Sequence, residues 1–177
     1  MPDRLDWGPG YTSADLDDAQ AKWGLRFPPD LVEMLLERRP ILSGGRGMID
    51  WVHTDEAVIE ERLQWPFEGF LFDVERNGLW WPEWGERPAK REERRELLQA
   101  EFSKAPKLVP IHSHRYLPSE PFESGNPVFS VHQSDVIHYG SDLADYFDRE
   151  ALGWGSKPWP TRIKRIPFWT VAVERNG

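Results

Sequence analysis

Residues 126–140 read NPVFSVHQSDVIHYG, and this stretch decides the fold class. Residues 127–131 and 136–139 are rich in β-branched and aromatic side chains, which favour strands, and Asp135 lies between them. Residues 108–112, LVPIH, have the same character. The C-terminal half of the chain is therefore expected to be built mostly from strands.

The chain before this stretch is expected to be mostly helical. Thr12 or Ser13 can cap the free N–H groups of a first helix, and Gly24 suits its end. Proline is tolerated in a first helical turn, so Pro28 and Pro29 are compatible with the start of a second helix. The helices expected in the whole chain cover about residues 12–24, 28–39, 54–65, 89–104 and 141–150.

Proline and glycine mark the expected ends and turns. Pro66 is expected to end the third helix, because proline removes a helical hydrogen bond. Asn77-Gly78 is a strong two-residue hairpin signal between residues 70–74 and 79–81, both of which look like strands. The glycine-rich residues 43–47 do not follow a strand, so they predict a loop and not a phosphate cradle. Two further strands are expected at 48–52 and within 163–173.

The expected helices come first along the chain and the expected strands cluster later, without an alternating βαβ order. This arrangement predicts an α+β fold. The length of 177 residues suits a single domain over residues 1–177. Ten Trp, nine Phe and four Tyr supply enough apolar area for a sizeable core.

With no cysteine, the sequence excludes disulfides, thiol nucleophiles and thiolate metal sites. No apolar run approaches the ~20 residues of a membrane span, and residues 1–6 lack an apolar signal segment, so a cytoplasmic protein without membrane contact is expected.

Charge is distributed unevenly along the chain. The formal net charge is −8, and residues 1–88 hold nine Lys/Arg against eighteen Asp/Glu. Nucleic-acid binding needs a basic field, so no nucleic-acid partner is expected. A basic protein partner fits the acidic half, and solubility alone is the other explanation for the charge.

Catalytic and metal motifs are weak. His112 and His114 lie two residues apart, so on a strand both rings could meet one cation, with a third ligand supplied by Asp135 or Glu120. No established metal-ligand spacing accompanies them, so neither a metal nor a cofactor is expected, although the pair leaves a zinc site open. No Gly-x-Ser-x-Gly elbow occurs, and neighbouring acids on helices point in different directions. The chain is therefore not expected to be an enzyme.

Three ordered segments resemble the SMI1/KNR4 family, also called the SUKH superfamily. They are WGLRFPPDL (residues 23–31), LWWPEWGERP (79–88) and a third segment within 108–147 that contains LVPI, HRYLP, GNPVFSV and DVIHYGSDLADYF. The resemblance covers about residues 12–150, and the Trp-rich C-terminal extension 152–177 has no counterpart. It implies a bent, mixed, mostly antiparallel sheet with packed helices and no shared catalytic residues.

The resemblance also implies a function. Bacterial members are associated with immunity to polymorphic toxins and bind a cognate toxin, often a nuclease, while fungal relatives are linked to cell-wall assembly. We therefore expect a non-catalytic protein-binding module, an immunity protein that faces a basic toxin domain; a cell-wall scaffold and a metal-dependent or carbohydrate-active enzyme are the alternatives. The partner's identity and the oligomeric state stay open.

An acidic face that contains tryptophan is expected to meet the partner. Its expected members are Trp80, Trp81, Trp84, Asp135, Asp142 and Asp145. The residues expected to hold the fold around this face are His114, Arg115, Tyr116 and Gly140. For the three tryptophans the alternative is a core of large rings, because residues 80 and 81 of a strand point in opposite directions.

Overall fold

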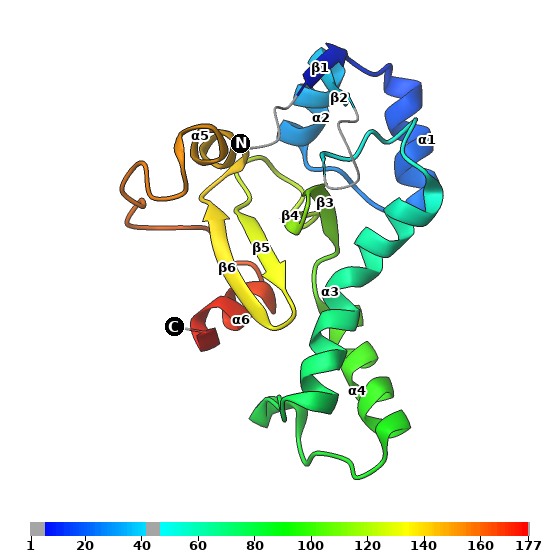
Figure 1. Cartoon of the computed structure of the whole chain (residues 1–177), viewed down its shortest axis with the longest axis vertical. Helices are drawn as coiled ribbons and strands as arrows, with labels where there is room; N and C mark the ends of the chain where they lie inside the picture. The colour runs from blue at the N-terminus through cyan, green and yellow to red at the C-terminus, as the bar shows by residue number, and fades with distance from the viewer. Residues whose placement is uncertain (1–5, 42–46, 177) are drawn as a thin grey trace.

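The computed structural model describes residues 6–41 and 47–176. It has the expected α+β architecture, with helices and antiparallel strands in one chain (Figure 1). In chain order the elements are β1 (Asp6–Pro9), α1 (Ser13–Trp23), α2 (Pro29–Glu37), β2 (Arg38–Ile41), α3 (Glu56–Arg76), the 3-10 helix η1 (Pro82–Trp84), α4 (Arg91–Lys104), β3 (Leu108–His112), β4 (Arg115–Pro118), β5 (Val128–His132), β6 (Asp135–Gly140), α5 (Leu143–Leu152) and α6 (Trp169–Asn176).

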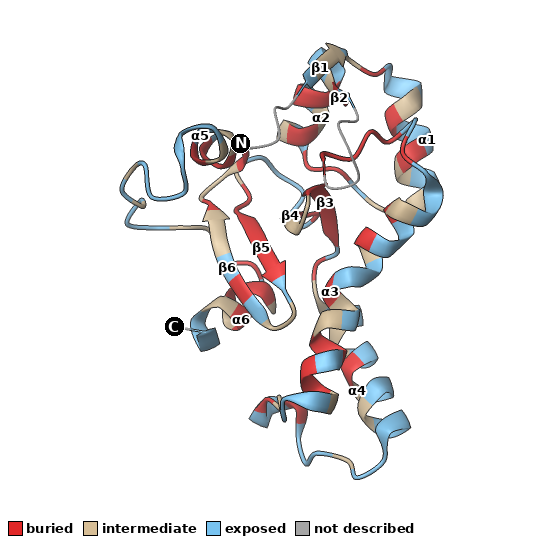
Figure 2. Cartoon of the chain, in the orientation of Figure 1, coloured by how far each residue is buried: buried red, intermediate tan, exposed pale blue. Residues whose placement is uncertain are grey.

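Two sheets contain these strands. β1 and β2 form one antiparallel pair, and β3, β4, β5 and β6 form a four-stranded antiparallel sheet in sequence order. Side chains alternate between the faces of this sheet. Tyr116 and Phe129 enter one hydrophobic cluster, whereas Leu117 and Val128 enter the other. The sheet therefore separates two cores, and β5 is buried along most of its length (Figure 2).

The first two helices form where the sequence predicts them. Thr12 caps α1 through a reciprocal capping box with Asp15, which satisfies two backbone N–H groups. Gly24 ends α1 in the left-handed region at φ 59°, a conformation that favours glycine. Pro29 occupies the first turn of α2, and α2 buries Leu31 among its apolar residues. Local signals therefore suffice for this part of the fold.

Helix α3 contradicts three of the expectations. It continues through Pro66 to Arg76, so residues 70–74 are helical and not a strand. Proline at 66 cannot donate to the carbonyl of Arg62, four residues before it. The hydroxyl of Tyr116 on β4 donates to that carbonyl instead, at 2.8 Å. The helix therefore passes the proline because a distant strand satisfies the freed acceptor.

The expected hairpin at residues 77–78 is likewise wrong. Asn77 caps the C-terminus of α3, its backbone N–H bonded to Asp73 O and its side chain to the Asp73 carboxylate. Residues 79–81 are not a strand; they lead into η1. The expected strand at 48–52 is reduced to a single bridge between Met48 and His112.

Two turns of the four-stranded sheet dock on α3. Ser113 in the β3–β4 turn and Gln133 in the β5–β6 turn both have positive φ, 51° and 57°. At Gly69, an added Cβ would lie 2.8 Å from the Cα of Gln133, so only glycine permits this approach. Four residues further along, Asp73 accepts hydrogen bonds from the backbone N–H and the hydroxyl of Ser134, at 2.8 and 2.5 Å. At the β3–β4 turn, the guanidinium of Arg62 on α3 donates to the carbonyl of Ser113. Helix α3 therefore supports the ends of both hairpins.

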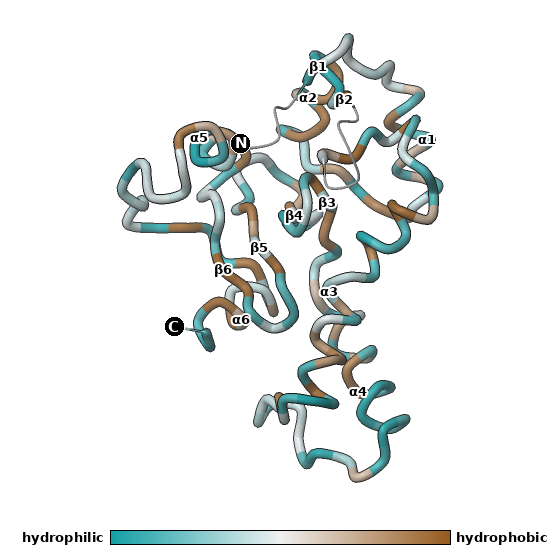
Figure 3. Tube along the Cα trace, in the orientation of Figure 1, coloured by the Kyte–Doolittle hydropathy of each residue, from teal (hydrophilic) through white to brown (hydrophobic). Residues whose placement is uncertain are grey.

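The C-terminal extension belongs to the core. The strand expected within 163–173 is wrong, since the segment ends in α6, and Ile166, Trp169 and Ala172 are buried in the second cluster. The indole Nε1 of Trp169 donates to the carbonyl of Pro106 at 2.8 Å. Helix α4, at one end of the molecule, consists mostly of hydrophilic residues (Figure 3). Two expectations fall outside the described residues: the absence of a signal segment in residues 1–5, and the loop at 43–47 except for its last residue.

Candidate functional site

The three tryptophans of the expected partner face belong mainly to the core. Trp81 and Trp84 are each 7% exposed, and their rings stack with centroids 4.8 Å apart. Trp81 also packs edge-on against Phe70, at 5.9 Å. Trp80 is half-buried, and its Nε1 donates to the carbonyl of Gly85 at 2.8 Å. The arrangement matches the alternative of a ring core and leaves only Trp80 partly open to solvent.

The three expected aspartates have separate surroundings. Asp135 is exposed at the start of β6, whereas Asp142 caps α5. Asp145 is buried and pairs with Arg149 at 2.8 Å and with Lys157 at 2.9 Å. Burial by itself would raise the pKa of Asp145, but hydrogen bonds, led by the one from Arg149, hold that pKa well below its usual range. Of the three carboxylates, only that of Asp135 is freely presented at the surface.

The four residues expected to hold the fold have clear structural contacts. Gly140 allows a close approach, because an added Cβ would lie 2.7 Å from the Cα of Tyr146. Tyr116 is fully buried, with its hydroxyl bound to α3 as described above. His114 contacts the guanidinium of Arg115 through its Nε2, and that guanidinium lies 3.9 Å from the centroid of the Tyr139 ring.

Histidine and arginine side chains gather on the face of the four-stranded sheet that carries Arg115. The strand register places one row across this face: His112, Arg115, Ser130 and Ile137. His112 Nδ1 lies 3.3 Å from the Tyr146 hydroxyl and 3.7 Å from Glu150 Oε1. The rings of His114 and His132 are 6.3 Å apart, centroid to centroid. Within residues 6–41 and 47–176, no group of three or more His, Cys, Asp or Glu side chains is arranged to hold a metal ion.

A stripe on the outer face of α3 presents aromatic rings to solvent. Glu61, Trp65, Glu68 and Phe72 follow the spacing i, i+4, i+7, i+11, so they share one side of the helix. Trp65 is 39% and Phe72 48% exposed. Neither ring contacts another ring in the part of the chain that the structure describes, and Glu68 pairs with Arg95 at 3.1 Å on the surface. We call these four residues the α3 stripe.

The sequence contains the spacing of the α3 stripe, but the proline within it conceals that one helix carries all four residues. Ending the helix at Pro66 separates Trp65 from Phe72 and places the latter in a strand. The i, i+4, i+7, i+11 pattern becomes visible only once the helix is known to continue.

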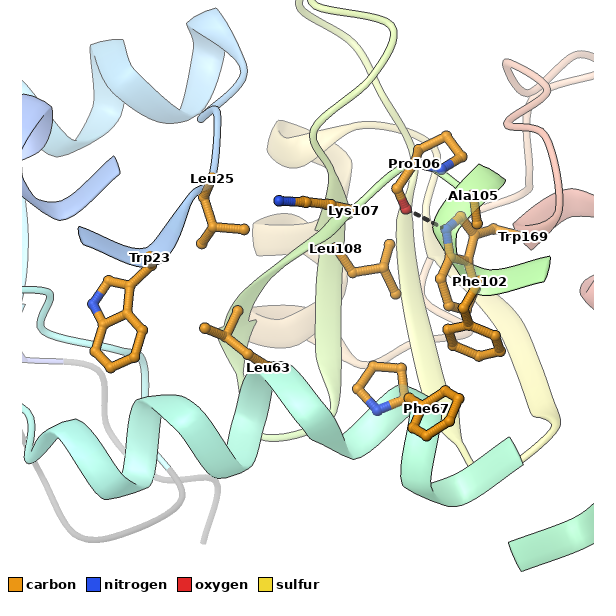
Figure 4. Close-up of a pocket in the computed structure, with 11 residues that line it drawn as sticks. Trp23, Leu25, Leu63, Phe67, Phe102, Ala105, Pro106, Lys107, Leu108 and Trp169 are labelled. Carbon is orange, nitrogen blue, oxygen red and sulfur yellow. Dashed lines mark hydrogen bonds between the residues drawn. The ribbon is translucent and has the colours of Figure 1, made fainter. Parts of the chain in front are cut away.

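An apolar groove of about 280 Å³ opens beside α3 (Figure 4). Leu63 lies below the groove on α3, with Trp23 at one end and Trp169 at the other. Lys107 is its charged lining residue, and the Lys107 Nζ donates to the carbonyl of Gly24 at 2.7 Å. The groove has room for an apolar side chain, but its walls do not select a particular ligand chemistry.

Comparison with known proteins returns no match: no protein-family model fits the sequence, and neither a curated protein nor a solved structure is significantly similar. Among the described residues, no helix combines the length and the apolar character needed to cross a membrane.

Proposed function

We propose that this protein is a non-catalytic protein-binding module that neutralises a basic protein, and that the α3 stripe is its contact surface. The observation that carries the proposal is the pair of exposed rings, Trp65 and Phe72, which alternate with the carboxylates of Glu61 and Glu68 along one side of a continuous helix. Aromatic side chains dominate the energetics of protein interfaces when they are desolvated at the centre of the contact.

The charge around the stripe favours a basic partner. Glu60 and Glu61 are exposed on α3 close to Trp65, and the N-terminal half of the chain carries twice as many acidic as basic residues. Opposite charge on the partner would accelerate association and make it sensitive to salt. A nuclease toxin has such a basic surface, since it must bind nucleic acid, and the resemblance to the SMI1/KNR4 family points to the same class of partner.

The experiment begins with cross-linking and mass spectrometry in the source cell, and the captured protein is then purified and its dissociation constant measured. We expect a basic protein whose affinity falls at least tenfold in Trp65→Ala and in Phe72→Ala, and falls again at high salt. Leu152→Ala is the matched control, because Leu152 is a 73% exposed apolar residue outside the stripe.

Equal affinity of the wild type and the Trp65→Ala/Phe72→Ala double variant would refute the assignment of the stripe. An immunity role further requires that the purified protein inhibits its partner's activity at equimolar concentration. Capture of cell-wall synthesis proteins, without inhibition of any activity, would favour the scaffold alternative.

A further inference from the structure

A second site lies on the sheet face that carries Arg115, and it does not depend on the α3 stripe. We propose that Arg115, oriented by His114 and accompanied by His132, binds an oxyanion: a phosphoryl group, either free or carried by a small molecule. Three features of the arginine support this site: its orientation, its missing counter-charge and its access to solvent.

The guanidinium of Arg115 is fixed in place by two uncharged partners. One is the ring of Tyr139, 3.9 Å from the guanidinium carbon, and the other is Nε2 of His114. An arginine does not deprotonate in proteins, so the Nη1 of Arg115 donates and the histidine Nε2 accepts. The proton of a neutral His114 therefore lies on Nδ1, which faces the Ser113 hydroxyl at 3.2 Å. Imidazole and phenol rings thus orient the guanidinium without neutralising it.

Arg115 also lacks the counter-charge that comparable arginines have. It is half-buried, and no carboxylate lies within ion-pair distance of it in the described part of the chain. Three other arginines with buried or half-buried side chains each pair with a carboxylate: Arg39 with Asp50, Arg94 with Glu75, and Arg149 with Asp145. The Nε of Arg115 is buried without a hydrogen-bond partner. A partly desolvated, uncompensated guanidinium is unfavourable by itself and is stabilised when an anion binds.

The field around His114 has the same sign. Burial, and next to it the charge of Arg115, lowers the pKa of His114 to about 4, with His132, His112 and Arg62 acting in the same direction. The carboxylate of Glu150 on the neighbouring helix α5 lies 3.7 Å from His112 and forms no ion pair with the arginine. Positive charge therefore dominates on the Arg115 side of the row.

Solvent reaches the cluster through His132, which is exposed at the end of β5. A guanidinium fork, with the imidazole N–H donors beside it, matches the several acceptor oxygens of a phosphoryl group in number and geometry. The ligand is expected to be small, because the net charge of −8 opposes the approach of a nucleic acid.

The test is an NMR titration of the full chain with labelled histidines. Inorganic phosphate is added at pH 7 and constant ionic strength, and the histidine resonances are recorded at each step. We expect saturable shifts of the His114 and His132 resonances in the millimolar range and a rise in the pKa of His114. Arg115→Gln should weaken binding at least tenfold, whereas Arg162→Gln, which removes an exposed arginine, should leave it within twofold.

His132→Gln provides a second variant at an exposed position, where folding is not at risk, and it should weaken binding severalfold. Phenyl phosphate is titrated in parallel: tighter binding than inorganic phosphate identifies a phosphorylated small molecule as the ligand, and equal binding identifies free phosphate. Shifts that do not saturate, that chloride reproduces, or that persist unchanged in Arg115→Gln would overturn the proposal. A negative result here leaves the α3 stripe untouched, and the converse also holds.

Discussion

Replacing Tyr116 by Phe should destabilise the protein, and the size of the effect should depend on residue 66. The lost hydroxyl donates to the carbonyl of Arg62, which Pro66 cannot serve because it has no N–H. Tyr116 is fully buried, so the substitution leaves that carbonyl without water as well. A buried acceptor left unsatisfied costs about 1–3 kcal/mol, and we expect Tyr116→Phe to lower the free energy of unfolding by about 2 kcal/mol.

A double-mutant cycle separates this reasoning from a simple packing effect. Pro66→Ala supplies the missing N–H, so in that background the Arg62 carbonyl has a second donor, and Tyr116→Phe should cost only about 0.5 kcal/mol. Urea denaturation of the four proteins, with a common m-value, gives the coupling free energy directly, and we expect about 1.5 kcal/mol. Equal costs in the two backgrounds would show that the tyrosine hydroxyl does not compensate for the proline.

Two further predictions concern the packing of the sheet and a buried ion pair. Gly69→Ala should destabilise the protein by about 1–2 kcal/mol, because the added Cβ meets the backbone of Gln133 at 2.8 Å, although alanine in an open helix position gains about 1 kcal/mol over glycine. Ala100→Gly at an exposed position of α4 measures the alanine–glycine difference in helix propensity by urea unfolding. A stabilising effect of Gly69→Ala would contradict the docking of the turn. Asp145→Asn should lower stability at pH 7 by about 3 kcal/mol, since it leaves the charge of Arg149 buried. Because the folded-state pKa of Asp145 is lowered, the stabilisation by its carboxylate is present above the unfolded pKa of about 4 and is lost below it. Lowering the pH should therefore bring the unfolding curves of the wild type and Asp145→Asn together. A constant difference between the two proteins down to strongly acidic pH would contradict the lowered pKa.

Sequence alone predicts the parts of the fold that local chemistry determines. The capping box at Thr12, the left-handed Gly24 and the strand-rich residues 126–140 are each readable from a few neighbouring side chains. The β3–β4 turn is not readable in this way, since its positive φ falls on Ser113 and not on the glycine or asparagine that signals such turns. None of the expected strands covers residues 115–118, which form strand β4 in the structure.

Long-range contacts explain the remaining errors. Pro66 predicts a helix end from its neighbours alone, because the donor that serves the Arg62 carbonyl lies 54 positions away on β4. A helix that ends at Pro66 also conceals the α3 stripe, whereas the tryptophans at 80, 81 and 84 form a visible cluster within residues 79–88. Their burial follows from packing against α3 and against the C-terminal segment around Phe168, and neither partner was expected to be placed there.

The hydrogen bond that preserves α3 also bears on the proposed function. From Glu61 to Phe72 the stripe spans 11 positions, about 16 Å at 1.5 Å per residue, and Pro66 lies within it. If the helix bent or frayed at the proline, the Trp65 and Phe72 rings would no longer keep the fixed separation that a rigid partner surface requires. Tyr116 itself is fully buried in the sheet, so its side chain is not part of the exposed stripe. Stability and recognition are therefore coupled through one backbone carbonyl: Tyr116→Phe should weaken partner binding without removing a single contact atom, and Pro66→Ala should restore both properties together.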